Sequence, residues 1–191
     1  MSLIKLTVED FIRELASANP TPGGGSASAL AGAMSAAMVE MACNLTIGRE
    51  KFRDVEEELQ TVLGRATKLR GAMLDAVDDD TQAYNAVSQA HKLPRSTEDE
   101  KKQRTETMQA ALQQASEVPL AVARAAQETM QLAAIAVQKS NPNVASDAKV
   151  AILLAEAARD GAIANVEINL GSISDGAFIA RMRDELRAFR G

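Results

Sequence analysis

The spacing of apolar and polar residues predicts a chain made of amphipathic helices joined by short loops. In each segment apolar residues recur three and four positions apart, which is the period of one helical face. The predicted helices cover residues 8–18, 26–47, 53–91, 97–118, 120–139, 146–170 and 174–190. Because short loops between long helices favour antiparallel neighbours, the pattern predicts an all-α, single-domain antiparallel helix bundle with about seven helices over residues 1–191.

Capping and breaking residues mark the helix boundaries. Side chains that can bind the free amides of a first helical turn stand before four segments: Thr7, Thr97, Ser146-Asp147 and Ser174-Asp175. Pro119 interrupts the pattern between two of the segments. Because proline lacks an amide hydrogen and clashes with the preceding turn, it either kinks one long helix or begins the next.

Segment 26–47 differs from the other helices because it carries almost no charge before Glu40. Its alanine, serine and glycine residues form narrow rows along which neighbouring backbones can approach closely. We expect this helix to be buried on most sides. A second copy of the chain is expected to cover part of it, because one thin layer of neighbouring helices leaves some of such a surface open.

A run of three glycines at positions 23–25 precedes this helix and follows the stiff sequence Pro20-Thr21-Pro22. Ser26 is predicted to cap the helix, and the glycines leave bare amides beside its N-terminus. Free amides and the partial positive charge of a helix start suit an anionic or carbonyl-bearing ligand. The alternative is a sharp turn that only allows close packing. A nucleotide phosphate loop is excluded because the required Lys-Ser/Thr pair is absent.

The composition excludes several functional classes. Aromatic residues make up only 3% of the chain and tryptophan is absent, which favours helices over strands. A net charge of −5 argues against binding to nucleic acid or to an anionic membrane, because both require a basic surface. No apolar run reaches about 18 residues and Met1–Leu6 is too short for a signal peptide, so we expect a cytoplasmic protein.

Cysteine and histidine each occur once, as Cys43 and His91, which leaves little for disulfides, thiolate metal sites or histidine triads. Cys43 stands among apolar residues, so it is predicted to be part of the core rather than a nucleophile. His91 is predicted to complement the dipole at a helix end rather than to take part in chemistry.

Five motifs together resemble the cyclodeaminase/cyclohydrolase family of folate enzymes, which includes the C-terminal domain of formiminotransferase-cyclodeaminase. They occur in the family's order and spread over nearly the whole chain: Pro20–Ala33, Asp80–Tyr84, Leu93-Pro94, Asn141 with Ser146–Ala148, and Asn165–Leu170. The first string is highly specific, whereas each of the others is weak by itself. The resemblance implies an all-helical subunit that forms a homodimer or a larger assembly and binds folate near the interface.

The resemblance implies one of two enzyme activities. A formimidoyltetrahydrofolate cyclodeaminase forms 5,10-methenyltetrahydrofolate and ammonia, and a methenyltetrahydrofolate cyclohydrolase forms 10-formyltetrahydrofolate. The motifs do not separate the two. A non-catalytic helical scaffold or a folate-binding protein is the alternative from another class. Whether the folate is polyglutamylated, and whether a separate formiminotransferase is a partner, stay open.

Neither reaction requires a metal or any cofactor beyond the tetrahydrofolate substrate, but both require a proton to be moved at the bridge between N5 and N10. Asp147 is the first candidate for this acid or base, because it stands at a predicted helix start beside Asn141 and Ser146. Asp80 is the second, one helical turn from Tyr84, and burial would raise its pKa. The structural alternatives are a helix-start acid and a solvated acidic face.

Other residues are candidates for substrate binding. The glycine loop would supply amides, and an asparagine on a largely apolar helix needs a polar partner that a ligand can provide. The anionic glutamate tail of folate needs cations, with solvated surface lysines as the alternative. The predicted substrate-binding residues are Gly23, Gly24, Gly25, Ser26, Tyr84, Asn141, Ser146, Asn165, Arg49, Lys51 and Lys139.

Overall fold

The computed structural model describes residues 2–189, which form six α-helices and three short 3-10 helices with no strand among them. In chain order the elements are η1 (Leu3–Lys5), α1 (Val8–Leu15), α2 (Gly24–Asn44), η2 (Glu50–Val55), α3 (Glu56–His91), α4 (Glu98–Lys139), η3 (Pro142–Val144), α5 (Ala145–Leu170) and α6 (Gly176–Ala188).

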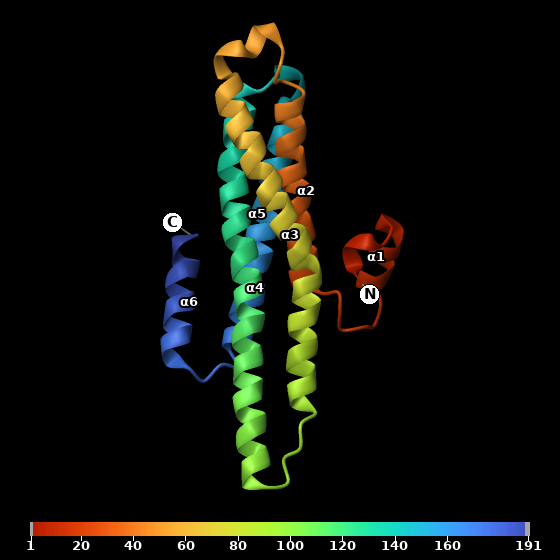
Figure 1. The fold of residues 1–191 in the computed structure, drawn as a ribbon, viewed down its shortest axis with the longest axis vertical. Coiled ribbons are helices and arrows are strands. Elements are labelled where there is room, and N and C mark those ends of the chain that lie inside the picture. Colours follow the sequence, from red (N-terminus) through yellow and green to blue (C-terminus); the bar gives the residue numbers. More distant parts are fainter. Residues whose placement is uncertain (1, 190–191) are drawn as a thin grey trace.

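Helices α2 to α5 form an elongated antiparallel four-helix bundle (Figure 1). Within it, α2 packs on α3 and α5, and α4 packs on the same two helices. Helix α6 lies along the outside of α4, to which the ion pairs Arg181–Glu117 and Arg124–Glu185 join it. Helix α1 lies to the side of the bundle and buries only Phe11. The predicted all-α antiparallel bundle is therefore confirmed.

Helix α2 is the small-residue helix of the core. Ala29, Ala36 and Ala42 are fully buried, and a Cβ added at Gly32 would lie 2.4 Å from Met73 Sδ of α3. By length and hydropathy α2 could also cross a membrane, alone among the helices of residues 2–189. However, 56% of that apolar window is buried inside the bundle, and a core helix satisfies the same criterion.

Helix α4 continues without interruption through Pro119. The proline has no amide hydrogen to donate to the Ala115 carbonyl, and Asn169 of α5 takes its place by donating from Nδ2 at 2.8 Å. Of the two alternatives stated for Pro119, one long helix is therefore the correct one, and it spans the segments 97–118 and 120–139. The predicted count of about seven α-helices is corrected to six for this reason.

Three of the predicted caps are confirmed. Thr7 Oγ1 accepts a hydrogen bond from Asp10 N at 3.1 Å, and Thr97 forms a capping box with Glu100. Asp175 Oδ1 accepts hydrogen bonds from the backbone amides of Ala177 and Phe178 in the first turn of α6. At these three ends the local sequence alone decides where the helix begins.

Ser26 and the pair Ser146-Asp147 do not cap helices, contrary to the prediction. Helix α2 begins earlier, with Gly23 at the N-cap, because Asp80 of α3 binds its first turn from outside. Helix α5 begins one residue before Ser146, because η3, which Asn141 caps, continues directly into it. The start of α2 thus depends on a residue 54 positions away, whereas the start of α5 follows from the local turn at Asn141.

Candidate active site

A cavity of about 410 Å³ lies where the glycine loop enters α2. Its walls come from this loop and from α3, α4 and α5, which are distant in sequence. Helix α2 starts partway along α3 (Figure 1). The cavity lies at this N-terminal end of α2. Six of the predicted site residues line it: Gly23, Gly24, Gly25, Asp80, Tyr84 and Asn165.

Asp80 joins α3 to the N-terminus of α2. Its Oδ2 accepts hydrogen bonds from Ser26 N and Ser26 Oγ, both at 2.9 Å. The hydroxyl of Ser26 also lies 2.9 Å from the Val77 carbonyl oxygen, and its single hydrogen can bind either acceptor. The backbone amide of Ser26 is therefore the fixed donor, and Asp80 acts as the cap that α2 lacks.

Close approach explains two of the three glycines. A Cβ on Gly25 would lie 2.0 Å from Asp80 Oδ1, and one on Gly24 would lie 3.1 Å from Asn165 Nδ2. At Gly23 a Cβ would meet only a carbonyl oxygen of the loop, at an ordinary 3.7 Å. The loop needs glycine at these two positions because side chains lie directly against its backbone. These are the carboxyl group of Asp80 from α3 and the amide group of Asn165 from α5.

The environment of Asp80 favours proton transfer. Burial raises the pKa of the Asp80 carboxyl group above its ordinary value, although the side-chain and backbone hydrogen bonds from Ser26 lower it. Ser26 holds Oδ2, whereas Oδ1 accepts no hydrogen bond from any group in residues 2–189. A carboxyl group with a raised pKa and one free oxygen in a cavity can take up and release a proton.

The amides of the glycine loop are also free to bind a ligand. The amide groups of Gly24 and Gly25 donate no hydrogen bond within the described part of the chain, as expected for the first turn of a helix. Both residues line the cavity, where the partial positive charge of the α2 N-terminus adds to their effect. The loop therefore offers donors beside the carboxyl group of Asp80.

Apart from Ser26, which binds Asp80, the remaining predicted residues lie at the opposite end of the bundle, where α2 ends and α5 begins (Figure 1). There the backbone amide of Asn141 donates to Thr46 Oγ1 at 2.8 Å, and Lys139 forms an ion pair with Glu58. The predicted residues at this end are Arg49, Lys51, Lys139, Asn141, Ser146 and Asp147.

Asp147 is far from the cavity in its own subunit. Asp147 and Asn165 share one face of α5, because they are eighteen residues or five full helical turns apart, which is about 27 Å along the axis. Asp147 is half-buried, and its carboxylate forms no hydrogen bond or ion pair within residues 2–189. A single subunit does not bring the two predicted catalytic carboxylates together.

Cys43 and His91 take no part in the cavity. Cys43 is fully buried, and burial, together with the charge of Glu40, raises the pKa of its thiol to about 11. His91 is exposed at the end of α3, where Arg104 donates to its carbonyl oxygen. Within residues 2–189 no group of three or more His, Cys, Asp or Glu side chains could hold a metal ion.

The cavity also contains residues that sequence reasoning did not select. They include Thr21 in the glycine loop and Ile168 and Ser172 around the end of α5, together with Asn169, which belongs to the motif Asn165–Leu170 but is not among the predicted substrate-binding residues. Thr21 is part of the loop motif, and Asn169 follows Asn165 by one helical turn, so the sequence contained a pattern that pointed to each of them. An exposed isoleucine and a serine at a helix end carry no such signal.

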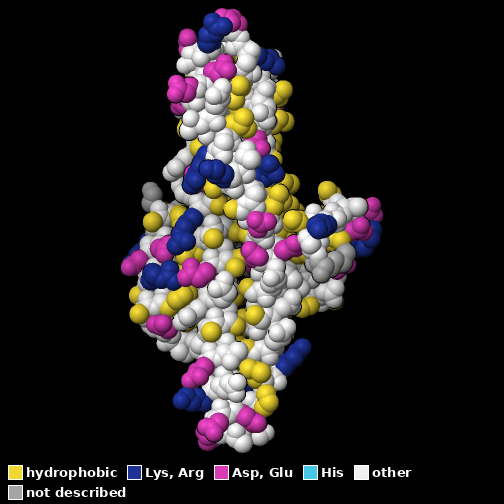
Figure 2. Space-filling view, viewed as in Figure 1, with side chains coloured by type: hydrophobic (Ala, Val, Ile, Leu, Met, Phe, Trp, Pro, Cys, Tyr) yellow, Lys and Arg dark blue, Asp and Glu magenta, His cyan; other side chains and the backbone are white. Residues whose placement is uncertain are grey.

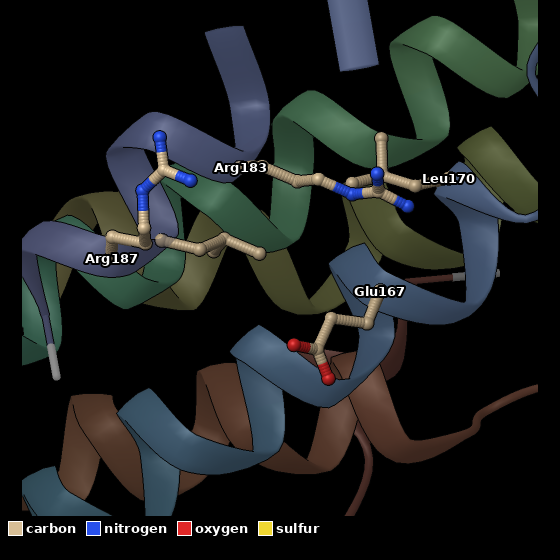
Figure 3. A pocket seen from close by; sticks show the side chains of 5 residues that line it. Glu167, Leu170, Arg183 and Arg187 are labelled. Carbon is tan, nitrogen blue, oxygen red and sulfur yellow. The ribbon is translucent and has the colours of Figure 1, made fainter. Parts of the chain in front are cut away.

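A second hollow, of about 360 Å³, lies between α5 and α6 (Figure 3). Glu167 of α5 and Arg183 and Arg187 of α6 line it, and Arg187 is paired with Asp184. All three lining ionisable side chains are exposed to solvent, where charges interact weakly. The cavity at the glycine loop, with its half-buried carboxyl group, is therefore the candidate active site.

Comparisons with known proteins show the family to which the chain belongs. The model of the formiminotransferase-cyclodeaminase family matches residues 7–188. The chain is 45% identical to a methenyltetrahydrofolate cyclohydrolase from Methylorubrum extorquens, over 94% of this chain and 86% of that protein. It is 33% identical to the formimidoyltransferase-cyclodeaminase of Sus scrofa over 97% of this chain, but it spans only 34% of that longer protein.

A solved structure has the same fold. The crystal structure of a formiminotetrahydrofolate cyclodeaminase from Thermotoga maritima matches with a TM-score of 0.87 at 32% identity, covering 97% of this chain and 89% of that chain. The family model and these relatives all cover almost the whole of this chain. The chain therefore belongs to the formiminotransferase-cyclodeaminase family.

Proposed function

We propose that this protein is an enzyme of folate one-carbon metabolism, a methenyltetrahydrofolate cyclohydrolase that converts 5,10-methenyltetrahydrofolate to 10-formyltetrahydrofolate. The observation that carries the proposal is the cavity in which Asp80, with a raised pKa and one free oxygen, lies beside unpaired amides. The 45% identity to a cyclohydrolase of similar length favours hydrolysis as the reaction.

The reaction needs one group that both accepts and returns a proton. Water adds to the carbon between N5 and N10 while the Asp80 carboxylate takes one of its protons through Oδ1. Asp80 then delivers this proton to N5 as the C–N5 bond breaks, and the formyl group stays on N10. The remaining proton of the water leaves to solvent, because the methenyl bridge is a cation and the formyl product is neutral.

The glycine loop assists the same step. As the hydroxyl on the tetrahedral carbon loses its proton, negative charge develops on its oxygen. The free amides of Gly24 and Gly25 at the α2 N-terminus suit this charge. Ser26 keeps Asp80 Oδ2 in place throughout, so the reacting oxygen, Oδ1, stays aimed at the cavity.

The second candidate is formimidoyltetrahydrofolate cyclodeaminase. It is favoured by the TM-score of 0.87 to a solved enzyme of that name. In that reaction N10 attacks the formimino carbon on N5 and ammonia leaves, so Asp80 would take the N10 proton and protonate the departing nitrogen. The two reactions use the same N5–C–N10 bridge and the same carboxyl group.

A side-by-side assay tests the proposal, because the methenyl group absorbs in the near ultraviolet. With 5,10-methenyltetrahydrofolate we expect the absorbance to fall faster than in spontaneous hydrolysis, and with 5-formimidoyltetrahydrofolate we expect no rise. A rise together with released ammonia would instead identify a cyclodeaminase. No change with either substrate would contradict both activities and leave a folate-binding protein or a scaffold.

We also propose that the working unit is a homodimer formed through α2 and α5. Hydrophobic side chains gather along the edge of the bundle where α2 lies (Figure 2). Exposed apolar residues of α2, its C-cap and α5 are Met34, Met41, Leu45, Val150, Leu153 and Ile168. A face of this kind on a core helix marks a protein interface.

An antiparallel dimer would unite the two halves of the predicted site. Because Asp147 and Asn165 lie on one face of α5, a second copy running in the opposite direction would place the Asp147 end of one subunit beside the Asp80 cavity of the other. Asp147 would then act as a second acid in the cavity of its neighbour, and Asn141 and Ser146 would contact the substrate.

The same pairing would supply cations for the substrate. Arg49, Lys51 and Lys139 lie at the Asp147 end and would stand where the glutamate tail of the folate leaves the cavity. We propose on this basis a polyglutamylated folate substrate. A cytoplasmic location is proposed separately, from the sequence expectation alone. A separate formiminotransferase would be a partner for the cyclodeaminase alternative, since it would supply the formimidoyl substrate.

A further inference from the structure

We propose that Asn169 recognises an N–H donor of the pterin ring of the substrate, and that Pro119 is the positioning residue that orients the Asn169 amide. The inference rests on the proposed function, because the pterin ring of 5,10-methenyltetrahydrofolate carries such donors: the lactam N–H, the exocyclic amino group and the ring N8–H. Asn169 and Ala115, the two residues that Pro119 acts on, both line the cavity.

Pro119 exposes one backbone carbonyl group inside the bundle. It lies fully buried near the middle of α4, where a proline is otherwise costly for a helix. Because it has no amide hydrogen, the carbonyl of Ala115, one turn earlier, lacks its usual helical donor. Asn169 Nδ2 supplies the missing donor from α5 at 2.8 Å.

This hydrogen bond fixes which way round the amide of Asn169 lies. A carbonyl group can only accept a hydrogen bond, so the NH2 group of Asn169 must face Ala115 and Oδ1 must be the other atom. Oδ1 accepts no hydrogen bond from any group in residues 2–189, and no buried side-chain oxygen or nitrogen there lacks a partner. Oδ1 is therefore an accessible acceptor on a residue that lines the cavity.

Asn165 shows that this arrangement is not a general property of the helix. Its Nδ2 donates to the Gly161 carbonyl within α5 itself, at 2.8 Å, so its orientation owes nothing to α4. Asn169 is the asparagine whose amide is held across the helix interface. The helix-breaking residue in α4 thus has a consequence one helix away, inside the cavity.

The test compares Pro119→Ala, Asn169→Ala and the double variant in hydrolysis of 5,10-methenyltetrahydrofolate. Pro119→Ala restores an amide that competes for the Ala115 carbonyl and frees the Asn169 amide to turn. Each single variant is expected to raise KM about five- to tenfold, the value of one hydrogen bond, with kcat little changed. The double variant should be no worse than Asn169→Ala alone, because Pro119 acts only through Asn169.

Gly64→Ala is the matched control, a helix-interior change in α3 where an added Cβ meets nothing within 4 Å. It should leave KM unchanged. Additive effects of the two substitutions on KM, or an unchanged KM in Asn169→Ala, would overturn the inference. If Pro119→Ala does not fold, Asn169→Ala alone decides. An inactive wild-type enzyme would contradict the proposed function itself, whereas an active one with unaffected variants contradicts only this inference.

Discussion

Asp80 is the residue on which both the helix start and the proposed chemistry depend. Its Oδ2 binds the first turn of α2, and its Oδ1 is an accessible oxygen, without a hydrogen-bond partner in residues 2–189, on a residue that lines the cavity. The neighbouring aspartates have different tasks, since Asp78 accepts hydrogen bonds from Ser2 Oγ and Leu3 N, both at 2.6 Å, and Asp79 is exposed. Two of the three consecutive aspartates therefore bind other segments of the chain rather than forming a solvated face.

Gly25→Ala should damage the site directly. The added Cβ would lie 2.0 Å from Asp80 Oδ1, so either the carboxyl group or the loop must move. We expect a loss of about 1–3 kcal/mol in unfolding free energy and a large loss of hydrolysis. Gly64→Ala, which meets open space, should keep its activity. Wild-type activity in Gly25→Ala would show that Asp80 need not lie against the loop.

The pH profile should report the raised pKa of Asp80. Only the ionised carboxylate can take a proton from water, so kcat/KM falls as the pH drops through this pKa. Because burial raises the pKa, the acidic limb should lie at a higher pH than an ordinary aspartate gives, and Asp80→Asn should remove it. A limb at the ordinary value would contradict the assignment.

The ionisation of Asp80 that raises activity should lower the free energy of unfolding. The folded protein holds the Asp80 proton more tightly than the unfolded chain does. Ionisation therefore costs stability as the pH rises from the unfolded pKa through the folded one. Across that interval, urea unfolding should show wild type losing stability relative to Asp80→Asn.

At the scale of helices, sequence predicted what is local and failed where another helix decides. The caps at Thr7, Thr97 and Asp175 follow from their own neighbours and were predictable. At Pro119 the sequence left one long helix and two helices as alternatives, because the choice between them depends on Asn169 of α5, which donates to a carbonyl group of α4. Likewise, α2 begins before Ser26 because its capping carboxylate comes from α3.

The N-terminal segment should detach from the bundle when its anchor is removed. Asp78→Ala deletes both hydrogen bonds to η1, and hydrogen bonds to a charged group contribute about 1–3 kcal/mol. We expect faster amide exchange at residues 3–6 with the bundle intact. Asp79→Ala is the control, because Asp79 forms no hydrogen bond or ion pair within residues 2–189. Equal exchange in the two variants would argue against the anchor.

At the scale of the whole molecule, sequence predicted the components of the site but not their separation. The motif residues around Asp80 and around Asp147 lie at opposite ends of one bundle. Helical periodicity shows which residues share a face, yet it does not show which end of a helix meets which neighbour. Whether these halves meet is a property of the assembly.

Mixing two inactive variants tests the antiparallel dimer. If each active site takes Asp80 from one subunit and Asp147 from the other, Asp80→Asn and Asp147→Asn should both be inactive as pure dimers. After subunit exchange, half of the dimers are mixed and carry one intact site, so about a quarter of wild-type activity should return. Leu153→Glu, placed on the exposed apolar face, should give monomers in sedimentation. Inactive mixtures would contradict an active site shared between two subunits.

The most direct test of the account is the turnover of Asp80→Asn with 5,10-methenyltetrahydrofolate, measured together with the affinity of the variant for the same folate. The amide keeps the size of the side chain and an oxygen for Ser26, but it cannot carry a proton. We predict that kcat falls by about 10²- to 10⁴-fold while the affinity changes little. A kcat close to that of wild type in a correctly folded Asp80→Asn variant would contradict the account.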